Sequence, residues 1–97
     1  MRVDITASAA VFAQAHGGTL WVWAAYPRLR CDGMQAWMHV ATREPPGRSG
    51  FLPLAADGVE VRFRRFGSRD PEVLQIALRG RRRPRLEAYW DGCLYAT

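Results

Sequence analysis

The chain has 97 residues, 48% of them apolar, and a net charge of +5 from 14 basic residues, all arginines. This length is typical of one domain, so we expect a single domain over residues 1–97. No apolar run approaches the roughly 20 residues that span a bilayer, the start does not resemble a secretory signal, and two cysteines are too few for a disulfide scaffold, so the sequence predicts a cytoplasmic protein.

The first 18 residues predict a strand followed by a helix. Val3–Ile5 alternates as a short strand does, and the alanine-rich stretch 7–15 favours a helix of two to three turns. Thr6 or Ser8 offers a side-chain oxygen for the N-cap. Gly17 and Gly18 are expected to end the helix, because glycine is the usual residue after a helix C-terminus.

The next segment predicts two strands and two loops. Residues 19–26 are apolar on both faces, which indicates a central strand covered on both sides and ended by Pro27. Residues 28–33 are expected to form a polar loop, and residues 35–42 a second strand. Residues 43–50 are rich in proline and glycine and predict a loop. Residues 51–54 predict a short piece at a sheet edge, because Pro53 is disfavoured in a central strand.

The last 40 residues predict more strands joined by tight turns. Asp57-Gly58 is a strong turn signal, and the alternation of residues 59–64 after it is the clearest half-buried strand pattern in the chain. Residues 74–78 and 86–90 alternate as well, with a basic turn over residues 79–84 between them. A final turn at Asp91-Gly92 leads into residues 93–95. The pattern as a whole indicates a strand-dominated α+β fold.

Few residues suggest catalysis. The only histidines are His16 and His39, and neither has a nucleophile or an orienting carboxylate beside it in sequence, so we expect both to be structural and the chain not to be an enzyme. The four tryptophans fall in predicted strands, where aromatic side chains usually pack against neighbours. A stacking platform for a ligand is the alternative.

The strongest charge cluster lies in the basic turn. Five arginines occur within seven residues, and they are Arg79, Arg81, Arg82, Arg83 and Arg85. Such a cluster could bind anions or the phosphates of a nucleic acid. The favoured interpretation is a solvated hairpin tip, because the segment has no exposed aromatic series for base stacking and the absence of lysine points to a compositional bias.

Cys31 and Cys93 are the candidate metal ligands. Both fall on predicted turns beside glycine, whereas a cysteine that only fills a core would more naturally lie within a strand. A thiolate ligand needs such an accessible position. Two thiolates are short of the usual four of an iron–sulfur cluster, so a homodimer or further ligands would have to complete the site.

The order of these segments resembles the HesB-like family, which includes the A-type iron–sulfur cluster carriers. Residues 4–10 are similar to the family's strand-then-helix opening, residues 31–34 to its Gly-Cys-Ser-Gly loop, and residues 57–61 to its Asp-Gly-(Val/Ile)-x-(Val/Ile) strand. Cys93 lies near the position of the family's Cys-Gly-Cys tail. The resemblance covers nearly the whole chain. It implies a mixed β-sheet, barrel-like sandwich with one N-terminal helix.

The resemblance also implies a function with an incomplete ligand set. Arg30 and Asp32 replace the small residues around the first family cysteine, and only one of the two C-terminal cysteines is present. One hypothesis is an iron–sulfur cluster or metal carrier through Cys31 and Cys93 across a homodimer, with Asp32, Asp91 or other donors filling the missing positions. The alternatives are a HesB-like protein-interaction module without a cluster and a binder of anions or nucleic acid through the basic turn. No membrane association is expected.

Overall fold

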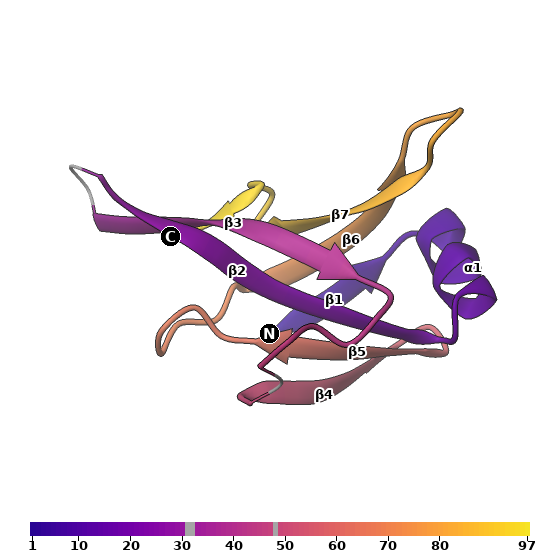
Figure 1. Ribbon diagram of the computed structural model, residues 1–97, viewed down its shortest axis with the longest axis horizontal. Coiled ribbons are helices and arrows are strands. Elements are labelled where there is room, and N and C mark those ends of the chain that lie inside the picture. The colour runs from indigo at the N-terminus through magenta and orange to yellow at the C-terminus, as the bar shows by residue number, and fades with distance from the viewer. Residues whose placement is uncertain (31–32, 48) are drawn as a thin grey trace.

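The computed structural model describes residues 1–30, 33–47 and 49–97 and shows a strand-dominated α+β fold, as the sequence predicts (Figure 1). In chain order, the described elements are β1 (Arg2–Ile5), α1 (Ala7–Ala15), β2 (Thr19–Arg30), β3 (Gly33–Ala41), β4 (Phe51–Ala56), β5 (Val59–Arg64), β6 (Val73–Arg79), β7 (Arg85–Trp90) and β8 (Tyr95–Ala96).

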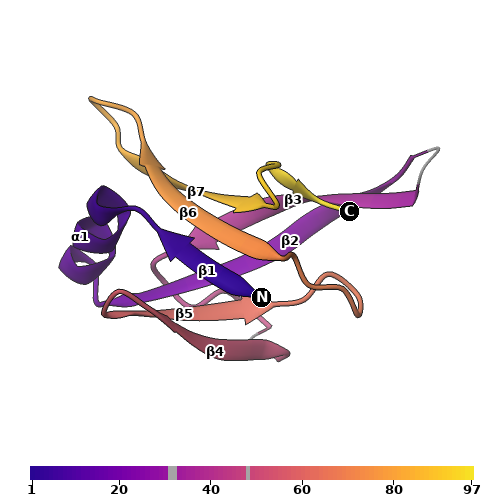
Figure 2. The same cartoon turned by 180° about the vertical axis from the view of Figure 1, so that it is seen from behind.

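The strands form two mixed sheets. One has three strands in the order β1-β6-β7, and the other has five in the order β4-β5-β2-β3-β8. Each sheet contains one parallel pair, β1 with β6 and β2 with β5, and its other pairs are antiparallel. Figure 2 shows β1, β6 and β7 crossing in front of the five-stranded sheet, so the two sheets form the layers of a sandwich.

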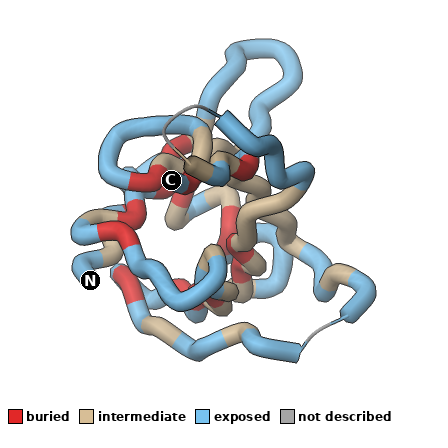
Figure 3. The backbone as a smooth tube through the Cα atoms, turned by 90° about the vertical axis from the view of Figure 1, so that its left-hand side faces the viewer, coloured by how far each residue is buried: buried red, intermediate tan, exposed pale blue. Residues whose placement is uncertain are grey.

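The core lies between the two sheets. Val59, Val61 and Phe63 alternate inward along β5 and are buried, as their sequence pattern predicts. They meet Leu74 and Ile76 of β6, which are also fully buried. Figure 3, a view along the long axis, shows buried segments around the centre and exposed hairpin loops at the periphery.

Helix α1 covers one end of this sandwich. The Thr6 side chain accepts a hydrogen bond from the Ala9 backbone N–H at 3.2 Å and forms the N-cap, which is one of the two caps that the sequence offers. Ala9 and Ala13 face the core and are fully buried. Gln14 Nε2 donates to the Gly58 carbonyl at 2.9 Å, which ties the helix to the β4–β5 turn.

Strand β2 is central, as expected, but two predictions about it are wrong. Pro27 does not end the strand, which continues to Arg30, so Arg28–Arg30 are not part of a polar loop. The reason is a bulge: the pairing register with β3 shifts between Ala25 and Arg28, and Tyr26 has a positive φ of 57°. A bulge accommodates a residue that lacks a backbone N–H without ending the ladder.

The second error concerns the outer face of β2. Leu20 and Val22 point into the core and are fully buried, but Trp21 and Trp23 on the opposite face are only partly buried. No element among the described residues covers that face as a second layer, because the three-stranded sheet packs on the inner side. The five-stranded sheet therefore presents a partly exposed aromatic face.

Turns and edges follow the sequence signals closely. Both Asp57-Gly58 and Asp91-Gly92 have two successive positive φ angles, the geometry of a type I′ turn. Strand β4 lies at the edge of its sheet, where Pro53 is tolerated, although it extends to Ala56 rather than ending at Leu54.

Candidate functional site

Cys93 lies on the tight turn between β7 and β8. The turn is closed by two backbone hydrogen bonds between Cys93 and Trp90, of 2.9 and 2.7 Å. The Asp91 carboxylate accepts a hydrogen bond from the Val73 backbone N–H at 2.9 Å, which holds the turn against β6. The Cys93 thiol is free and exposed. A rigid turn thus presents one accessible sulfur atom to solvent.

The other proposed ligands on the first loop, Cys31 and Asp32, lie outside the described residues. The described residue that follows them, Gly33, begins β3. Leu94, the neighbour of Cys93, accepts a hydrogen bond from the backbone N–H of Met38 at 2.9 Å. Met38 lies five residues along β3 from Gly33, or about 16 Å at a strand rise of roughly 3.3 Å per residue. Cys93 therefore lies beside the middle of β3, away from its start.

The described donors do not complete a metal site in one chain. Over residues 1–30, 33–47 and 49–97, no group of three or more His, Cys, Asp or Glu side chains is placed to hold a metal ion. Each histidine is engaged in packing. His16 stacks on Phe12, with 4.1 Å between ring centroids, and its Nδ1 lies 2.8 Å from the Phe12 carbonyl oxygen. His39 stacks on Trp23 at 5.7 Å.

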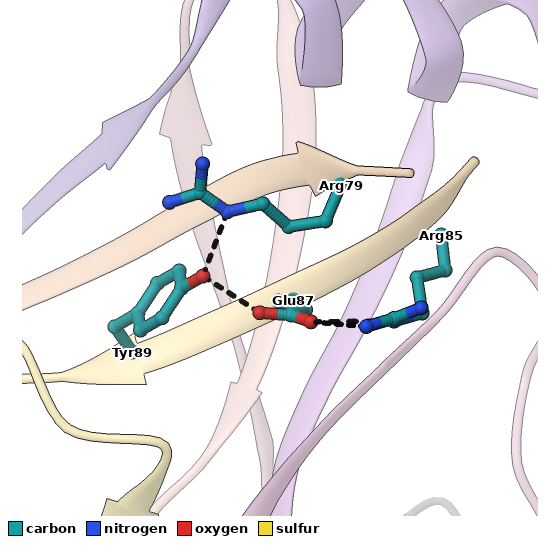
Figure 4. Close-up of polar contacts among 4 residues, drawn as sticks. All are labelled: Arg79, Arg85, Glu87 and Tyr89. Atoms are coloured by element: carbon teal, nitrogen blue, oxygen red, sulfur yellow. Dashed lines mark hydrogen bonds and ion pairs between the residues drawn. The ribbon is translucent and has the colours of Figure 1, made fainter. Parts of the chain in front are cut away.

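The basic turn divides its five arginines into two groups. Arg79 and Arg85 lie opposite each other at the base of the β6–β7 hairpin and belong to a polar network (Figure 4). All seven residues of segment 79–85 are exposed, and the three arginines at positions 81–83 form the tip. Gly80 has a φ of 93°, and a Cβ atom there would lie 2.6 Å from the Arg83 carbonyl oxygen, so only glycine fits this tip.

Tyr89 is the centre of that network. Its hydroxyl donates to a Glu87 carboxylate oxygen at 2.7 Å and accepts from Arg79 Nε at 3.1 Å, while Arg85 Nε donates to the other Glu87 oxygen at 3.2 Å. The hydrogen bond from Tyr89, reinforced by Arg85, holds the pKa of Glu87 below its usual value. The hydrogen bond to Tyr89 also raises the pKa of Arg79. The network fixes the base of the hairpin. The arginines at the tip take no part in it and remain available to bind an anion.

The aromatic face of the five-stranded sheet is a feature that the sequence pattern did not predict. Trp21 meets Phe51 edge to face at 5.2 Å, and the guanidinium carbon of Arg62 lies 5.3 Å from the centre of the Trp21 ring. Arg64 lies over Phe51 in the same way, at 5.0 Å. Arginines here pack on aromatic rings rather than standing free in solvent.

A cavity of about 330 Å³ opens at the other end of the same sheet. It is lined by Arg28, Arg30, Gln35, Ala36, Trp37 and Tyr95, from β2, β3 and β8. The sequence did not predict this cavity, because the expected strand ended at Pro27. The two arginines that follow were therefore expected in a loop and not on the sheet. The cavity is the one place in the described part of this sheet that combines arginines with a well-exposed tryptophan.

The sequence matches no protein-family model and no curated protein. The structure is similar to the crystal structure of Escherichia coli SufA, a protein involved in the biosynthesis of iron–sulfur clusters. The match has a TM-score of 0.56, covers 93% of this chain and 81% of that chain, and has 9% sequence identity. At this identity the likeness is one of fold, and it confirms the expected HesB-like sandwich. Within the described residues, no helix has the length and apolar character needed to span a membrane.

Proposed function

We propose that this chain is a HesB-like protein that carries an iron–sulfur cluster or a metal ion through Cys31 and Cys93. The supporting observation is the shared fold with SufA over 93% of the chain, combined with an exposed, free Cys93 thiol on a rigid turn. The cluster would be cargo for a protein partner. In this proposal the chain has no catalytic activity of its own and works in the cytoplasm, where thiols stay reduced.

The set of donors in one chain favours a site between two copies of the chain. Among residues 1–30, 33–47 and 49–97, no three metal-ligating side chains come together, so in this proposal a second copy supplies further donors. In a symmetric dimer, Cys93 of one chain can approach Cys31 of the other, and the symmetry then creates two equivalent sites with two thiolates each. Rieske centres show that two thiolates and two other donors suffice for a cluster. Asp91 and Asp32 are the carboxylates next to these cysteines.

Anaerobic reconstitution with iron and sulfide tests the proposal. We expect visible absorption in the wild type and its loss in both Cys31→Ser and Cys93→Ser. The cross-chain arrangement makes a further prediction: mixing the two variants rebuilds one of the two sites in each mixed dimer, which restores about a quarter of the wild-type absorption after free exchange of subunits.

Each outcome of this experiment separates two ideas. A coloured wild type whose variants do not complement each other would exclude the cross-chain arrangement. A colourless wild type, or colour that survives both substitutions, would overturn cluster binding through these cysteines. Ser68→Ala, which changes an exposed hydroxyl in the loop before β6, is the handling control and should keep the wild-type spectrum.

The second candidate is a HesB-like interaction module without a cluster. An apolar hollow of about 540 Å³ on the outer side of α1 favours it, lined by Ala7, Ser8, Val11, Phe12, Ala15 and Leu78. Val11, one of these lining residues, is 70% exposed. Exposed apolar surface of this kind is typical of protein contacts. A colourless protein in the reconstitution experiment would favour this candidate.

A further inference from the structure

The cavity at the end of the five-stranded sheet combines an aromatic surface with positive charge. Trp37 is 46% exposed, although it lies in the middle of a strand. Tyr95 of β8 meets it edge to face, with ring centroids 6.0 Å apart and planes at 82°, so the indole is held in one orientation. A rigid, solvent-facing indole is a surface on which any nucleobase can stack.

Two arginines border this indole. Arg28 and Arg30 are exposed, alternate along β2 and line the same cavity as Trp37. Neither forms an ion pair with any residue that the structure describes, in contrast to Arg62, which pairs with Glu60 at 2.8 Å. Two such guanidinium groups beside a cavity are suited to a phosphate, which they can contact through several N–H donors.

The remaining polar group in the cavity is an amide. Gln35 lies opposite Arg28 in the β2–β3 ladder and lines the cavity between the arginines and Trp37. Its side chain has both donor and acceptor atoms, so it can pair with the edge of any base. The aromatic, cationic and amide groups match, in turn, the face of the base, the phosphate and the edge of the base, which are the parts of a nucleotide that proteins contact in single strands.

We propose that this cavity binds a nucleotide unit of single-stranded nucleic acid, with the base on Trp37 and the phosphate at Arg28 and Arg30. The aromatic side chains of the sheet continue away from the cavity through His39 and Trp23, which stack at 5.7 Å, toward Phe51. A strand can therefore extend along the face.

The test is fluorescence anisotropy with a labelled single-stranded oligothymidine, its duplex with oligoadenosine, and thymidine monophosphate as competitor. We expect the single strand to bind more tightly than the duplex. Trp37→Leu should weaken binding roughly fivefold to a hundredfold, as the loss of one stacked base does, and Trp37→Phe should restore much of it. Arg28→Gln with Arg30→Gln should reduce the slope of log affinity against log salt by about 0.7 for each phosphate that these arginines neutralise in the wild type.

The matched control removes the same charge elsewhere. Arg81→Gln with Arg82→Gln changes two exposed arginines of the β6–β7 tip and should keep the effect of Trp37→Leu unchanged. Circular dichroism of every variant checks folding. Equal binding of duplex and single strand, or wild-type affinity in Trp37→Leu, would overturn the proposal. Competition by the monophosphate at the same concentration as the oligomer would assign the site to a free nucleotide instead, and the absence of binding would overturn the proposal.

Discussion

At the residue scale, His39 occupies the most unusual environment on the outer sheet face. Its ring stacks on Trp23 and meets Tyr26 edge to face at 5.4 Å. Its Nε2 atom is buried and has no hydrogen-bond partner among the described residues. Burying a polar atom without a partner costs about 1–3 kcal/mol, so the stacking has to offset that cost. The histidine contributes through its ring, in agreement with the structural role that the sequence favours.

An aromatic ring without the Nε2 atom should therefore stabilise the fold equally well. We expect His39→Phe to leave the free energy of unfolding unchanged or to raise it by up to about 1 kcal/mol, because the ring contacts remain and the unsatisfied atom is removed. His39→Ala, which removes both, should be destabilising. Urea denaturation measures the difference. A decrease of more than about 1 kcal/mol in His39→Phe would show that Nε2 makes a hydrogen bond that stabilises the fold.

At the scale of single elements, local signals predict far more than long-range ones. The two Asp-Gly turns and the alternation of β5 are encoded in neighbouring residues, and the structure confirms them. The extension of β2 past Pro27 is not encoded in neighbouring residues, because the bulge that makes it possible depends on pairing with β3. The Trp37 cavity depends on β8 as well, a strand of two residues whose partner only the folded chain supplies.

The β6–β7 hairpin supports a prediction about pH. Tyr89 and Arg85 lower the pKa of Glu87 in the folded chain, so the stabilisation is present above the unfolded pKa of this carboxyl group and is lost as the pH falls through the folded value. Tyr89→Phe removes the largest of these contributions. We expect the pKa of Glu87 to rise toward its usual value in this variant, and the stability of the hairpin to become less dependent on pH at the acidic end.

Carbon-13 NMR titration of the Glu87 carboxyl group measures this directly. Tyr95→Phe, which removes a hydroxyl from another strand, is the control and should give the same Glu87 pKa as the wild type. An unchanged Glu87 pKa in Tyr89→Phe would mean that the hydroxyl contributes little and that the arginines hold the carboxylate charged.

At the scale of the whole molecule, the two sheets depend on one shared core. Phe63 of β5 belongs to the five-stranded sheet and Trp90 of β7 to the three-stranded sheet, and their ring centroids lie 6.3 Å apart. Phe63 is fully buried, and Trp90 is 5% exposed. The family resemblance implied a sandwich, but the order of the strands within its two sheets was not evident from the sequence, because strand order depends on contacts between distant segments. The alternation did place Phe63 and Trp90 on buried faces.

This contact predicts that the sheets unfold together. Phe63→Ala should lower the free energy of unfolding by about 3–5 kcal/mol, a large share of the roughly 5–15 kcal/mol typical of a domain. Val11→Ala, at an exposed helix position, should change it by about 0.5 kcal/mol at most. Tryptophan fluorescence and far-ultraviolet circular dichroism should give one coincident transition in both variants, because the tryptophans occupy both sheets and a shared core melts as a unit. Two separate transitions in Phe63→Ala would show that each sheet retains stability of its own and that Phe63 joins two independent units.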